Sequence, residues 1–451
     1  MIDPGSVLLT DLYELTMLQA YFDEGLHEQA VFELFVRALP PQRRFLMAAG
    51  VEQVLDYLET LRFTAAELDW LRVTGRFRPA FIDMLRDFCF TGDVYAMREG
   101  TVFFGNEPVL RIEAPIAEAQ FVESRLINLV NFSSLIATKA ARCVLAASDR
   151  TLVDFGLRRA HAGEAGLLAA RASYLAGFAG SATVLAAQRY DIPMFGTMAH
   201  SYIEAHDLET DAFSAFAVSQ PNAVTLLIDT YDTEAAAIKV VALAPSLAAR
   251  GVKLASVRLD SGDLADHARK VRTILDEGGL GEVRIFASGN LDEYRIAALM
   301  ASNAPIDGFG IGTQLTTSAD APTLDSVYKL QSYAGRARRK RSEGKATWPG
   351  AKQVWRTLDT AGRLARDRIA RADEPPPEGD SLPLLQPVMR HGRRLTPAEP
   401  LAALRFHATS ELARLPEELK QFAPVDSASR YPVEISAGLS TLAQQLDRMP
   451  H

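Results

Sequence analysis

Histidine and carboxylate side chains just after short apolar runs are the residues of this sequence best suited to chemistry. His200 follows Gly196 and Thr197 at the end of such a run. Its imidazole titrates in the range that suits acid–base or nucleophilic work, although a hydrogen-bonded histidine at a helix start fits the sequence equally well. The turn Asp260-Ser-Gly-Asp263 carries two carboxylates, which suit Mg²⁺ or ribose hydroxyls. Its structural alternative is a helix N-cap.

Small residues and arginines follow three other apolar runs. Ser288-Gly-Asn and the segment 308–313, Gly-Phe-Gly-Ile-Gly-Thr, would let backbone N–H groups approach a phosphate closely. The alternative for each is a tight turn that needs a positive φ. Arg158 and Arg159 follow a further run, where they suit a phosphate or carboxylate partner or form a plain surface pair.

These polar clusters require elements that bring them to one place, and the middle of the chain has a suitable rhythm. Apolar runs alternate there with longer helical patterns; the runs lie at 151–156, 194–197, 224–229, 254–260, 283–288 and 308–312. Most are about 30 residues apart, the length of a strand–helix unit. The pattern predicts a closed α/β barrel, with an open doubly wound sheet as the alternative. Polar clusters close five of the six runs, and the carboxyl ends of parallel strands are where such folds bind ligands. The repeated occurrence of polar clusters at the ends of these runs favours an enzyme.

Three regions of different character are expected. Residues 1–150 mix helices with short strands and predict an α+β lobe with a helical linker over 116–147. Residues 151–335 form the predicted catalytic barrel. Residues 336–451 begin with a basic loop at 336–341, lose the rhythm of the barrel and predict an appended C-terminal lobe.

Composition sets outer limits on function. The 451 residues are 48% hydrophobic and 23% charged, with a formal net charge of −8, which excludes a disordered chain and disfavours nucleic acid as a partner. Two cysteines, Cys89 and Cys143, form neither a disulfide framework nor a zinc motif. The N-terminus has no basic, apolar leader, and the weakly polar stretch 165–188 contains Arg171. We therefore expect a cytoplasmic protein that does not cross a membrane.

Several of these motifs, taken together and in order, resemble the nicotinate phosphoribosyltransferase family. The matching segments are 10–17 (TDLYELTM), 155–161 (FGLRRAH), 196–201 (GTMAHS), 257–264 (VRLDSGDL), 288–293 (SGNLDE), 308–313 (GFGIGT), 327–330 (VYKL) and 349–352 (PGAK). The resemblance runs from about residue 6 to about 356 and is looser after about 360.

The resemblance implies an irregular, TIM-like α/β barrel of the type II phosphoribosyltransferase class, joined to an open-faced α+β sandwich lobe. It implies an enzyme that joins nicotinate to 5-phosphoribosyl-1-pyrophosphate in NAD salvage, releasing pyrophosphate and forming nicotinate mononucleotide. It also implies Mg²⁺, ATP as co-substrate with a ligase-type classification, phosphorylation at His200, and a homodimer with shared active sites.

The resemblance further assigns roles to individual residues. Tyr13 and Phe155 would hold the two faces of the pyridine ring, Arg258 its carboxylate or a phosphate, and Thr197 would bind nearby. Asp260 and Asp263 would be catalytic and hold ribose hydroxyls or Mg²⁺. The remaining substrate-binding residues divide between the 5′-phosphate (Ser288, Gly289, Gly312, Thr313) and the departing pyrophosphate (Arg158, Lys139).

Other functions remain open on the sequence alone. A nicotinamide enzyme would favour a carboxylate near the pyridine carbonyl, where Arg258 and Thr197 are predicted instead. A quinolinate enzyme would be shorter and lack the setting of His200. A catalytically silent binder of NAD precursors would not need His200, Asp260, Asp263 and Arg158 together. An unrelated barrel enzyme of phosphorylated sugars would need neither Tyr13 nor His200.

Overall fold

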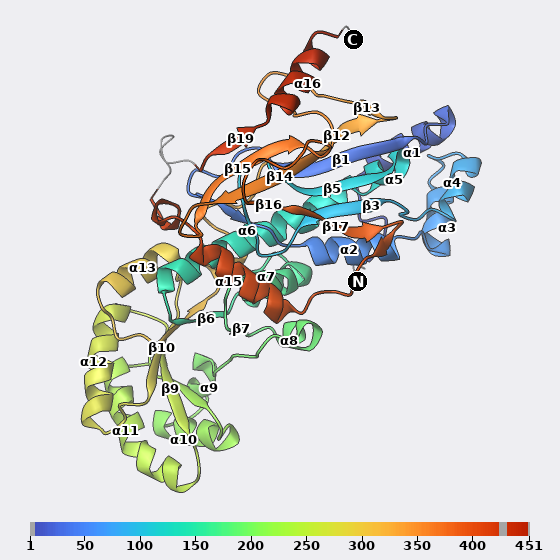
Figure 1. Ribbon diagram of the computed structural model, residues 1–451. Coiled ribbons are helices and arrows are strands. Elements are labelled where there is room, and N and C mark those ends of the chain that lie inside the picture. Colours follow the sequence, from blue (N-terminus) through green and yellow to red (C-terminus); the bar gives the residue numbers. More distant parts are fainter. Residues whose placement is uncertain (1–4, 424–430, 450–451) are drawn as a thin grey trace. The chain divides into compact units, whose positions relative to one another are not determined.

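The computed structural model describes residues 5–423 and 431–449, and its chain divides into two compact units (Figure 1). Unit 1 contains the chain up to Thr138 and again from Ala321 onward, and unit 2 contains Lys139–Asp320. The 25-residue helix α6 (Glu123–Ala147) contributes residues to both units.

Unit 2 is built on a six-stranded parallel sheet. Its strands, in spatial order, are β7 (Gly180–Ser181), β6 (Thr151–Asp154), β11 (Gly308–Ile311), β10 (Arg284–Ala287), β9 (Leu254–Leu259) and β8 (Val224–Leu227). Nearly every residue of β6, β8 and β11 is buried, as expected for strands covered on both faces. The sheet curls into a half-barrel with β7 and β8 as its edges.

Helices follow most of these strands. They are η1 (Leu157–Arg159), α7 (Gly163–Leu175), α8 (Val184–Tyr190), α9 (His200–Glu204), α10 (Glu209–Ser219), α11 (Thr233–Ala249), α12 (Leu264–Glu277), α13 (Glu293–Ala301) and α14 (Thr313–Thr316). In α12, Ala268, Val271 and Leu275 are buried, a spacing of three and four that turns one face inward. Aspartates cap α11, α12 and α13; they are Asp232, Asp263 and Asp292. Some of the polar residues at the strand ends are therefore helix caps.

Five of the six predicted strands are present, and the run at 194–197 is not one of them. Met194 makes only an isolated bridge to Ser181, and the strand at this position in the sheet is β7, only two residues long. Adding a side chain to Gly180 would place its Cβ 2.2 Å from the Pro193 carbonyl oxygen. The strand is missed because Gly and Ser carry no apolar pattern.

Unit 1 contains a seven-stranded antiparallel sheet to which both ends of the chain contribute. Its order is β13 (Arg336–Ala337), β12 (Ser326–Tyr333), β1 (Gln29–Val36), β5 (Pro108–Pro115), β3 (Asp93–Met97), β17 (Leu385–Arg390) and β18 (Arg393–Arg394). Smaller sheets comprise β16 (Ser381–Pro383), β14 (Lys352–Leu358), β15 (Leu364–Arg371) and β19 (Val433–Ile435), and the pair β2 (Leu46–Met47) and β4 (Val102–Phe103). The segments predicted as separate N- and C-terminal lobes thus share one sheet.

The helices of unit 1 lie on both sides of the sequence gap occupied by unit 2. They are α1 (Leu12–Glu24), α2 (Val51–Thr60), α3 (Ala65–Val73), α4 (Pro79–Leu85), α5 (Ile116–Phe121), α15 (Leu401–Ala413), η2 (Glu417–Lys420) and α16 (Ala437–Asp447). The predicted helical linker over 116–147 is present as α5 and α6, separated at Val122. The basic loop at 336–341 begins as β13, and Arg339 pairs with Asp447 of α16 over 2.6 Å.

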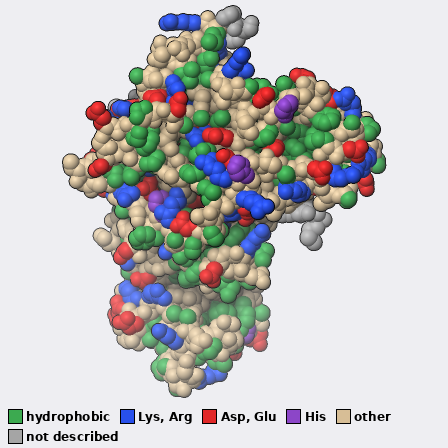
Figure 2. Space-filling view, turned by 45° about the vertical axis from the view of Figure 1, so that its right-hand side comes forward, with side chains coloured by type: hydrophobic (Ala, Val, Ile, Leu, Met, Phe, Trp, Pro, Cys, Tyr) green, Lys and Arg blue, Asp and Glu red, His purple; other side chains and the backbone are tan. Residues whose placement is uncertain are grey.

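Two surface properties bear on the partners predicted from composition. Among the described residues, α6 is the one helix long and apolar enough to cross a membrane, but 78% of its most apolar window is buried in the protein. On the face drawn in Figure 2, basic and acidic side chains are interspersed.

Glu14 of α1 is a buried carboxylate in unit 1 whose ionisation is linked to stability. Its Oε2 accepts a 3.1 Å hydrogen bond from Gln120 Nε2, and Glu123 lies nearby. Burial raises the pKa of Glu14 to about 7, since the hydrogen bonds from Gln120 and Tyr13 offset it only in part and the charge of Glu123 adds to it. Folding therefore favours the protonated acid.

We expect Glu14→Gln to remove a loss of stability that the wild type undergoes as pH rises. The folded pKa lies above the unfolded value of 4.5, so this contribution is complete below pH 4.5 and is lost as pH rises through about 7. The urea midpoint of the variant relative to wild type should be higher at pH 8 than at pH 5. An equal difference at both pH values would contradict the assignment. Glu67→Gln is the control: hydrogen bonds from Ser6 and Thr64 outweigh burial and lower the pKa of Glu67, so its loss should destabilise at both pH values.

Candidate active site

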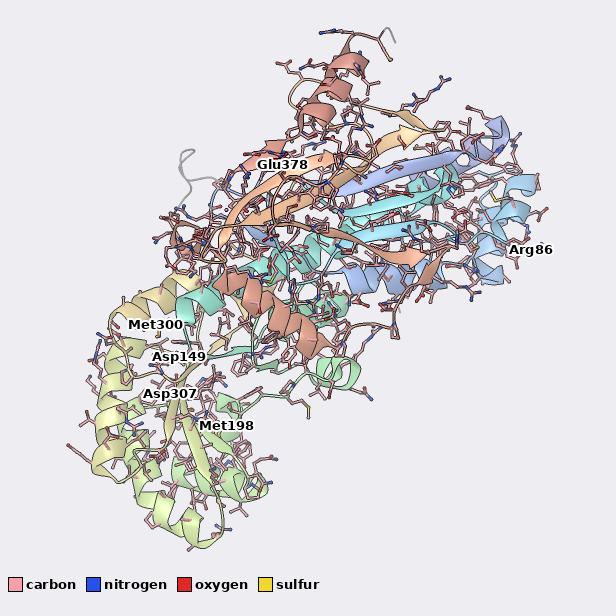
Figure 3. The ribbon with its side chains drawn as sticks, viewed as in Figure 1. Arg86, Asp149, Met198, Met300, Asp307 and Glu378 are labelled. Carbon is pink, nitrogen blue, oxygen red and sulfur yellow. The ribbon has the colours of Figure 1, made fainter. Side chains whose placement is uncertain are left out.

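The carboxyl ends of the parallel strands of unit 2 bring the candidate residues together. β8, β9, β10, β11 and β6 are hydrogen-bonded neighbours in that order, so the segments that follow them lie along one edge of the sheet. Asp149 and Asp307, labelled in Figure 3, precede β6 and β11 and mark the opposite, amino edge. Met198, also labelled, belongs to the segment between Thr197 and His200.

Arg258 of β9 is the centre of this arrangement. Its Nε donates to Ser288 Oγ over 2.9 Å, its Nη1 to Thr197 Oγ1 over 3.0 Å, and its Nη2 to Asp260 Oδ1 over 2.8 Å. The guanidinium carbon lies 5.4 Å from the centroid of the Phe155 ring, within the range of a cation–π contact. These bonds use three of the five N–H donors of the side chain. Two donors remain for an anion beside an aromatic face.

Asp260 is kept ionised by its neighbours. Burial alone would raise the pKa of this carboxyl, but hydrogen bonds from Ser288 and Arg258 and the charges of Arg258 and His200 outweigh burial and lower it. Ser288 Oγ donates directly to Asp260 Oδ1. The next residue, Gly289, has φ +98°, and a Cβ there would lie 2.0 Å from the Asp260 carbonyl oxygen. Only glycine allows this close approach of the two loops.

Two residues not singled out from the sequence, Asp229 and Thr230, lie between Asp260 and His200. Asp229 Oδ2 accepts from the Asp260 N–H over 2.8 Å and from Ser261 Oγ over 2.6 Å. Asp229 Oδ1 is buried with no hydrogen-bond partner. Thr230 Oγ1 lies 3.1 Å from His200 Nδ1, so it fixes the orientation of the imidazole. Both residues follow β8, the one predicted strand for which no polar cluster was noted at the carboxyl end. A search for polar residues at the end of every predicted strand would have identified them.

The loop at 288–290 follows β10 and the loop at 312–313 follows β11; they are called here the two glycine-rich loops. They are adjacent because β10 and β11 pair in parallel. Gly312 precedes the four-residue helix α14, and a Cβ there would lie 3.1 Å from the Phe155 carbonyl oxygen. Thr313, the first residue of α14, is exposed. Gln314 Nε2 donates to Asn290 Oδ1 over 2.9 Å, and Asn290 has φ +51°. The loops are thus tied together across their tips.

Phe155 is supported by a buried acid immediately before it. Asp154 accepts from the Gly156 N–H over 2.8 Å and from Ser181 Oγ over 2.7 Å, and burial raises its pKa. These bonds fix the turn after β6. The Phe155 ring lies 5.9 Å from that of Phe286, and a Cβ on Gly310 would lie 2.5 Å from Phe155. Glycine at 310 therefore makes room for the aromatic ring.

Four predicted site residues lie in other surroundings. Asp263 Oδ1 accepts from the backbone of Ala265 and Asp266 over 3.1 Å, which is the N-cap role. Arg158 is exposed in η1. Lys139 is buried in an ion-pair network on α6. Tyr13 is on α1 of unit 1 with 43% of its surface exposed; burial of the remainder raises its pKa.

The fit to Mg²⁺ follows from these acids. Among the described residues no group of three or more His, Cys, Asp or Glu side chains forms a ready-made metal cage. Mg²⁺ is commonly held by one or two carboxylates together with substrate phosphates. Asp260, with the unpaired Oδ1 of Asp229 beside it, meets that need, whereas Asp263 is committed to α12.

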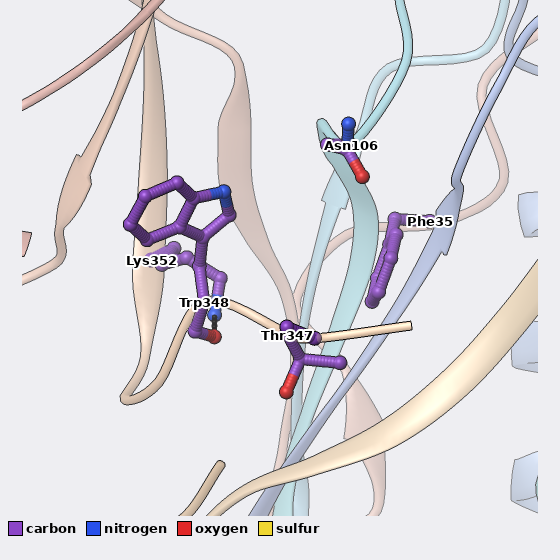
Figure 4. A pocket seen from close by; sticks show the side chains of 6 residues that line it. Phe35, Asn106, Thr347, Trp348 and Lys352 are labelled. Atoms are coloured by element: carbon purple, nitrogen blue, oxygen red, sulfur yellow. Dashed lines mark hydrogen bonds between the residues drawn. The ribbon is translucent and has the colours of Figure 1, made fainter. Parts of the chain in front are cut away.

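A small cavity in unit 1 does not compete with this site. Phe35, Asn106, Thr347, Trp348 and Lys352 are among its lining residues (Figure 4), and its volume is about 10 Å³. That is room for about one water molecule. Lys352 Nζ also donates to the Trp348 carbonyl over 2.7 Å, so the cavity wall is tied together.

Comparison with known proteins gives one consistent result. Three family profiles match in order: the nicotinate phosphoribosyltransferase N-terminal domain over residues 8–131, the nicotinate phosphoribosyltransferase family over 150–358, and its C-terminal domain over 380–443. The nicotinate phosphoribosyltransferase pncB2 of Mycobacterium tuberculosis is 48% identical, covering 98% of this chain and 94% of that protein. The Bacillus subtilis enzyme is 38% identical, covering 86% of this chain and 80% of that protein.

Solved structures agree with the sequence relatives. The crystal structure of human nicotinic acid phosphoribosyltransferase is similar with a TM-score of 0.86 at 30% identity, covering 97% of this chain and 100% of that chain. Nicotinate-nucleotide pyrophosphorylase of Pyrococcus furiosus is similar with a TM-score of 0.75 at 25% identity, covering 92% and 97%. The predicted type II phosphoribosyltransferase fold is confirmed by these neighbours.

Proposed function

Since this chain belongs to the nicotinate phosphoribosyltransferase family, we propose that it is an enzyme of NAD salvage that makes nicotinate mononucleotide from nicotinate and 5-phosphoribosyl-1-pyrophosphate. One observation carries the proposal: Arg258 donates hydrogen bonds to Thr197, Asp260 and Ser288 and lies beside the Phe155 ring at one edge of the sheet. A flat aromatic anion matches this combination of aromatic face and cationic donors.

The proposed reaction is a substitution at the ribose C1′. The pyridine nitrogen forms a bond to C1′ while the bond from C1′ to the pyrophosphate oxygen breaks, and positive charge develops on the sugar. Ionised Asp260 stabilises that charge, and Asp229 Oδ1 is a free acceptor for a ribose hydroxyl. The backbone N–H groups of 289–290 and 312–313 hold the 5′-phosphate, whereas the Ser288 N–H donates to the Leu259 carbonyl over 2.8 Å. Arg158 is exposed near the end of β6 and is assigned to the leaving pyrophosphate.

Mg²⁺ and ATP complete the proposal. Asp260 and Asp229 would hold Mg²⁺ with the diphosphate of the substrate, and the ion would neutralise charge on the leaving group. Asp263, the second acid of the pair predicted from the sequence, caps α12 instead. The γ-phosphoryl group of ATP would pass to an imidazole nitrogen of His200 with release of ADP, and water would later release phosphate. The hydrogen bond with Thr230 supports this role because it holds the ring in one orientation.

A homodimer with shared sites is also proposed. Val184, Leu185 and Met194 are between 50% and 69% exposed on α8 and the segment after it, and Val184 and Met194 line one open groove. Exposed apolar side chains that gather in this way are typical of protein–protein contacts. Tyr13, on α1 with the exposed Leu9 and Leu12, would reach the pyridine ring of a second copy. We also propose a cytoplasmic location, which suits Cys89 and Cys143 because neither forms a disulfide.

Product formation from labelled nicotinate tests the function directly. The full-length protein would be incubated with phosphoribosyl pyrophosphate and Mg²⁺, with and without ATP. We expect mononucleotide from nicotinate in both mixtures and faster with ATP, and little product from nicotinamide or quinolinate in parallel. A preference for either alternative substrate, or no product from nicotinate under any condition, would overturn the proposal.

A further inference from the structure

A network of four charged side chains, three of them buried, connects α6 to the segments that follow the two glycine-rich loops. Lys139 Nζ lies 2.5 Å from Glu293 Oε2 and 2.7 Å from Asp320 Oδ1. Arg142 Nε donates to Glu293 Oε1 over 2.8 Å. The side chains of Lys139, Arg142 and Glu293 are at most 2% exposed. These four side chains carry two positive and two negative charges, and such a balance is the condition under which buried charges are tolerated.

The two carboxylates of the network each follow one of the two glycine-rich loops in the chain. Glu293 is the first residue of α13, immediately after the loop that contains Ser288 and Gly289. Asp320 comes shortly after α14, whose N-cap is Gly312. The single ammonium of Lys139 therefore holds one acid downstream of each loop.

Lys139 is poorly suited to the direct contact with pyrophosphate that the family resemblance implies. Burial would lower the pKa of its ammonium, but the charges of Glu293 and Asp320 outweigh burial and raise it. The group is therefore a cation at neutral pH whose charge is already balanced by two carboxylates. Moving it to a substrate would leave the buried Glu293 and the partly buried Asp320 without that partner, a costly state.

We propose that Lys139 and Glu293 are positioning residues that fix the two glycine-rich loops relative to each other, so that both sets of backbone N–H groups meet one 5′-phosphate. The inference rests on the proposed function for the identity of the ligand. The surface hydrogen bond between Asn290 and Gln314 ties the loop tips, and the buried network ties their bases. Loops held at both points form a preorganised phosphate cradle.

Three variants test the proposal through charge balance. Lys139→Met and Glu293→Gln each leave the buried network with one unbalanced charge, whereas the double variant is neutral again. We expect each single variant to raise KM for phosphoribosyl pyrophosphate at least tenfold while KM for nicotinate changes less than twofold, and the double variant to recover most of the loss. Lys239→Met is the matched control: it removes the 2.9 Å partner of a buried acid, Glu209, elsewhere in unit 2 and should leave both KM values unchanged.

Hydrogen exchange gives a readout that needs no reaction. In the substrate-free protein, amides of 288–292 and 312–317 should exchange several-fold faster in both single variants than in wild type, and should return toward wild type in the double variant. If Lys139 contacted pyrophosphate directly, the double variant would stay as impaired as Lys139→Met and loop exchange would be unchanged; that result would overturn the inference. Should Lys139→Met fail to fold, the near-isosteric Glu293→Gln and the double variant still decide it. A wild type without activity but with the expected exchange pattern would count against the proposed function alone.

Discussion

Replacing Asp260 with asparagine is expected to lower kcat/KM for phosphoribosyl pyrophosphate by about 10²- to 10³-fold, the usual range for losing one preorganised charge at a reacting centre. Asp260 Oδ1 accepts hydrogen bonds from both Arg258 and Ser288, and its lowered pKa keeps it charged at neutral pH. An amide keeps the shape but removes the charge opposite the sugar. Steady-state kinetics with a check of folding by circular dichroism measures the effect.

Neighbouring aspartates make the Asp260 result specific. Asp232→Asn changes the N-cap of α11, where Asp232 accepts from the Ala235 N–H over 2.7 Å, and should leave kcat/KM unchanged because asparagine caps helices as well as aspartate does. Asp229→Asn should be impaired if Asp229 Oδ1 binds ribose or Mg²⁺. Asp263→Asn distinguishes two roles. If Asp263 is a helix cap, kcat/KM should change little; if it is the metal ligand that the family resemblance implies, kcat/KM should fall. An Asp260→Asn enzyme within threefold of wild type would remove Asp260 from the mechanism.

His200→Ala is expected to abolish stimulation by ATP, bringing the ratio of rates with and without ATP to about 1, while the slow ATP-independent reaction continues. The imidazole is the only group in the proposed mechanism that accepts the γ-phosphoryl, so its loss uncouples hydrolysis from synthesis. Parallel assays of mononucleotide and ADP measure the coupling. Transfer of label from [γ-³²P]ATP to the protein, stable to base and labile to acid, should occur in wild type and not in the variant.

Thr230 provides a graded test of the same role. Thr230→Val removes the hydroxyl 3.1 Å from His200 Nδ1 and should reduce ATP stimulation without abolishing it, whereas Thr230→Ser should retain it. Undiminished stimulation in His200→Ala would show that ATP acts elsewhere. Phosphorylation of the alanine variant at wild-type level would lead to the same conclusion.

Most of unit 2 was predictable from the sequence, because its signals are local. Apolar runs at 151–156, 224–229, 254–260, 283–288 and 308–312 became β6, β8, β9, β10 and β11, and a strand buried on both faces must be apolar throughout. The polar clusters that follow these strands lie together because the carboxyl ends of parallel strands share one edge of the sheet. Phe155, Arg258, Asp260 and Ser288 could be named in advance because each lies at such a strand end, and they do meet in space. Thr197 follows a run that forms no strand, yet it joins them through its hydrogen bond with Arg258.

Tertiary structure decided which of the polar residues face the site and which serve the fold. Asp260 and Asp263 are three residues apart on one turn, yet one accepts from Arg258 and the other from the first turn of α12. The sequence around Lys139 does not distinguish it from other helical lysines; only the fold brings Glu293 and Asp320 beside it. Asp229 has a role only because β8 lies next to β9. Likewise β12 joins β1 across nearly three hundred residues. Hydrogen bonds and ion pairs depend on distances between atoms, and folding sets those distances between residues whose separation along the chain carries no such information.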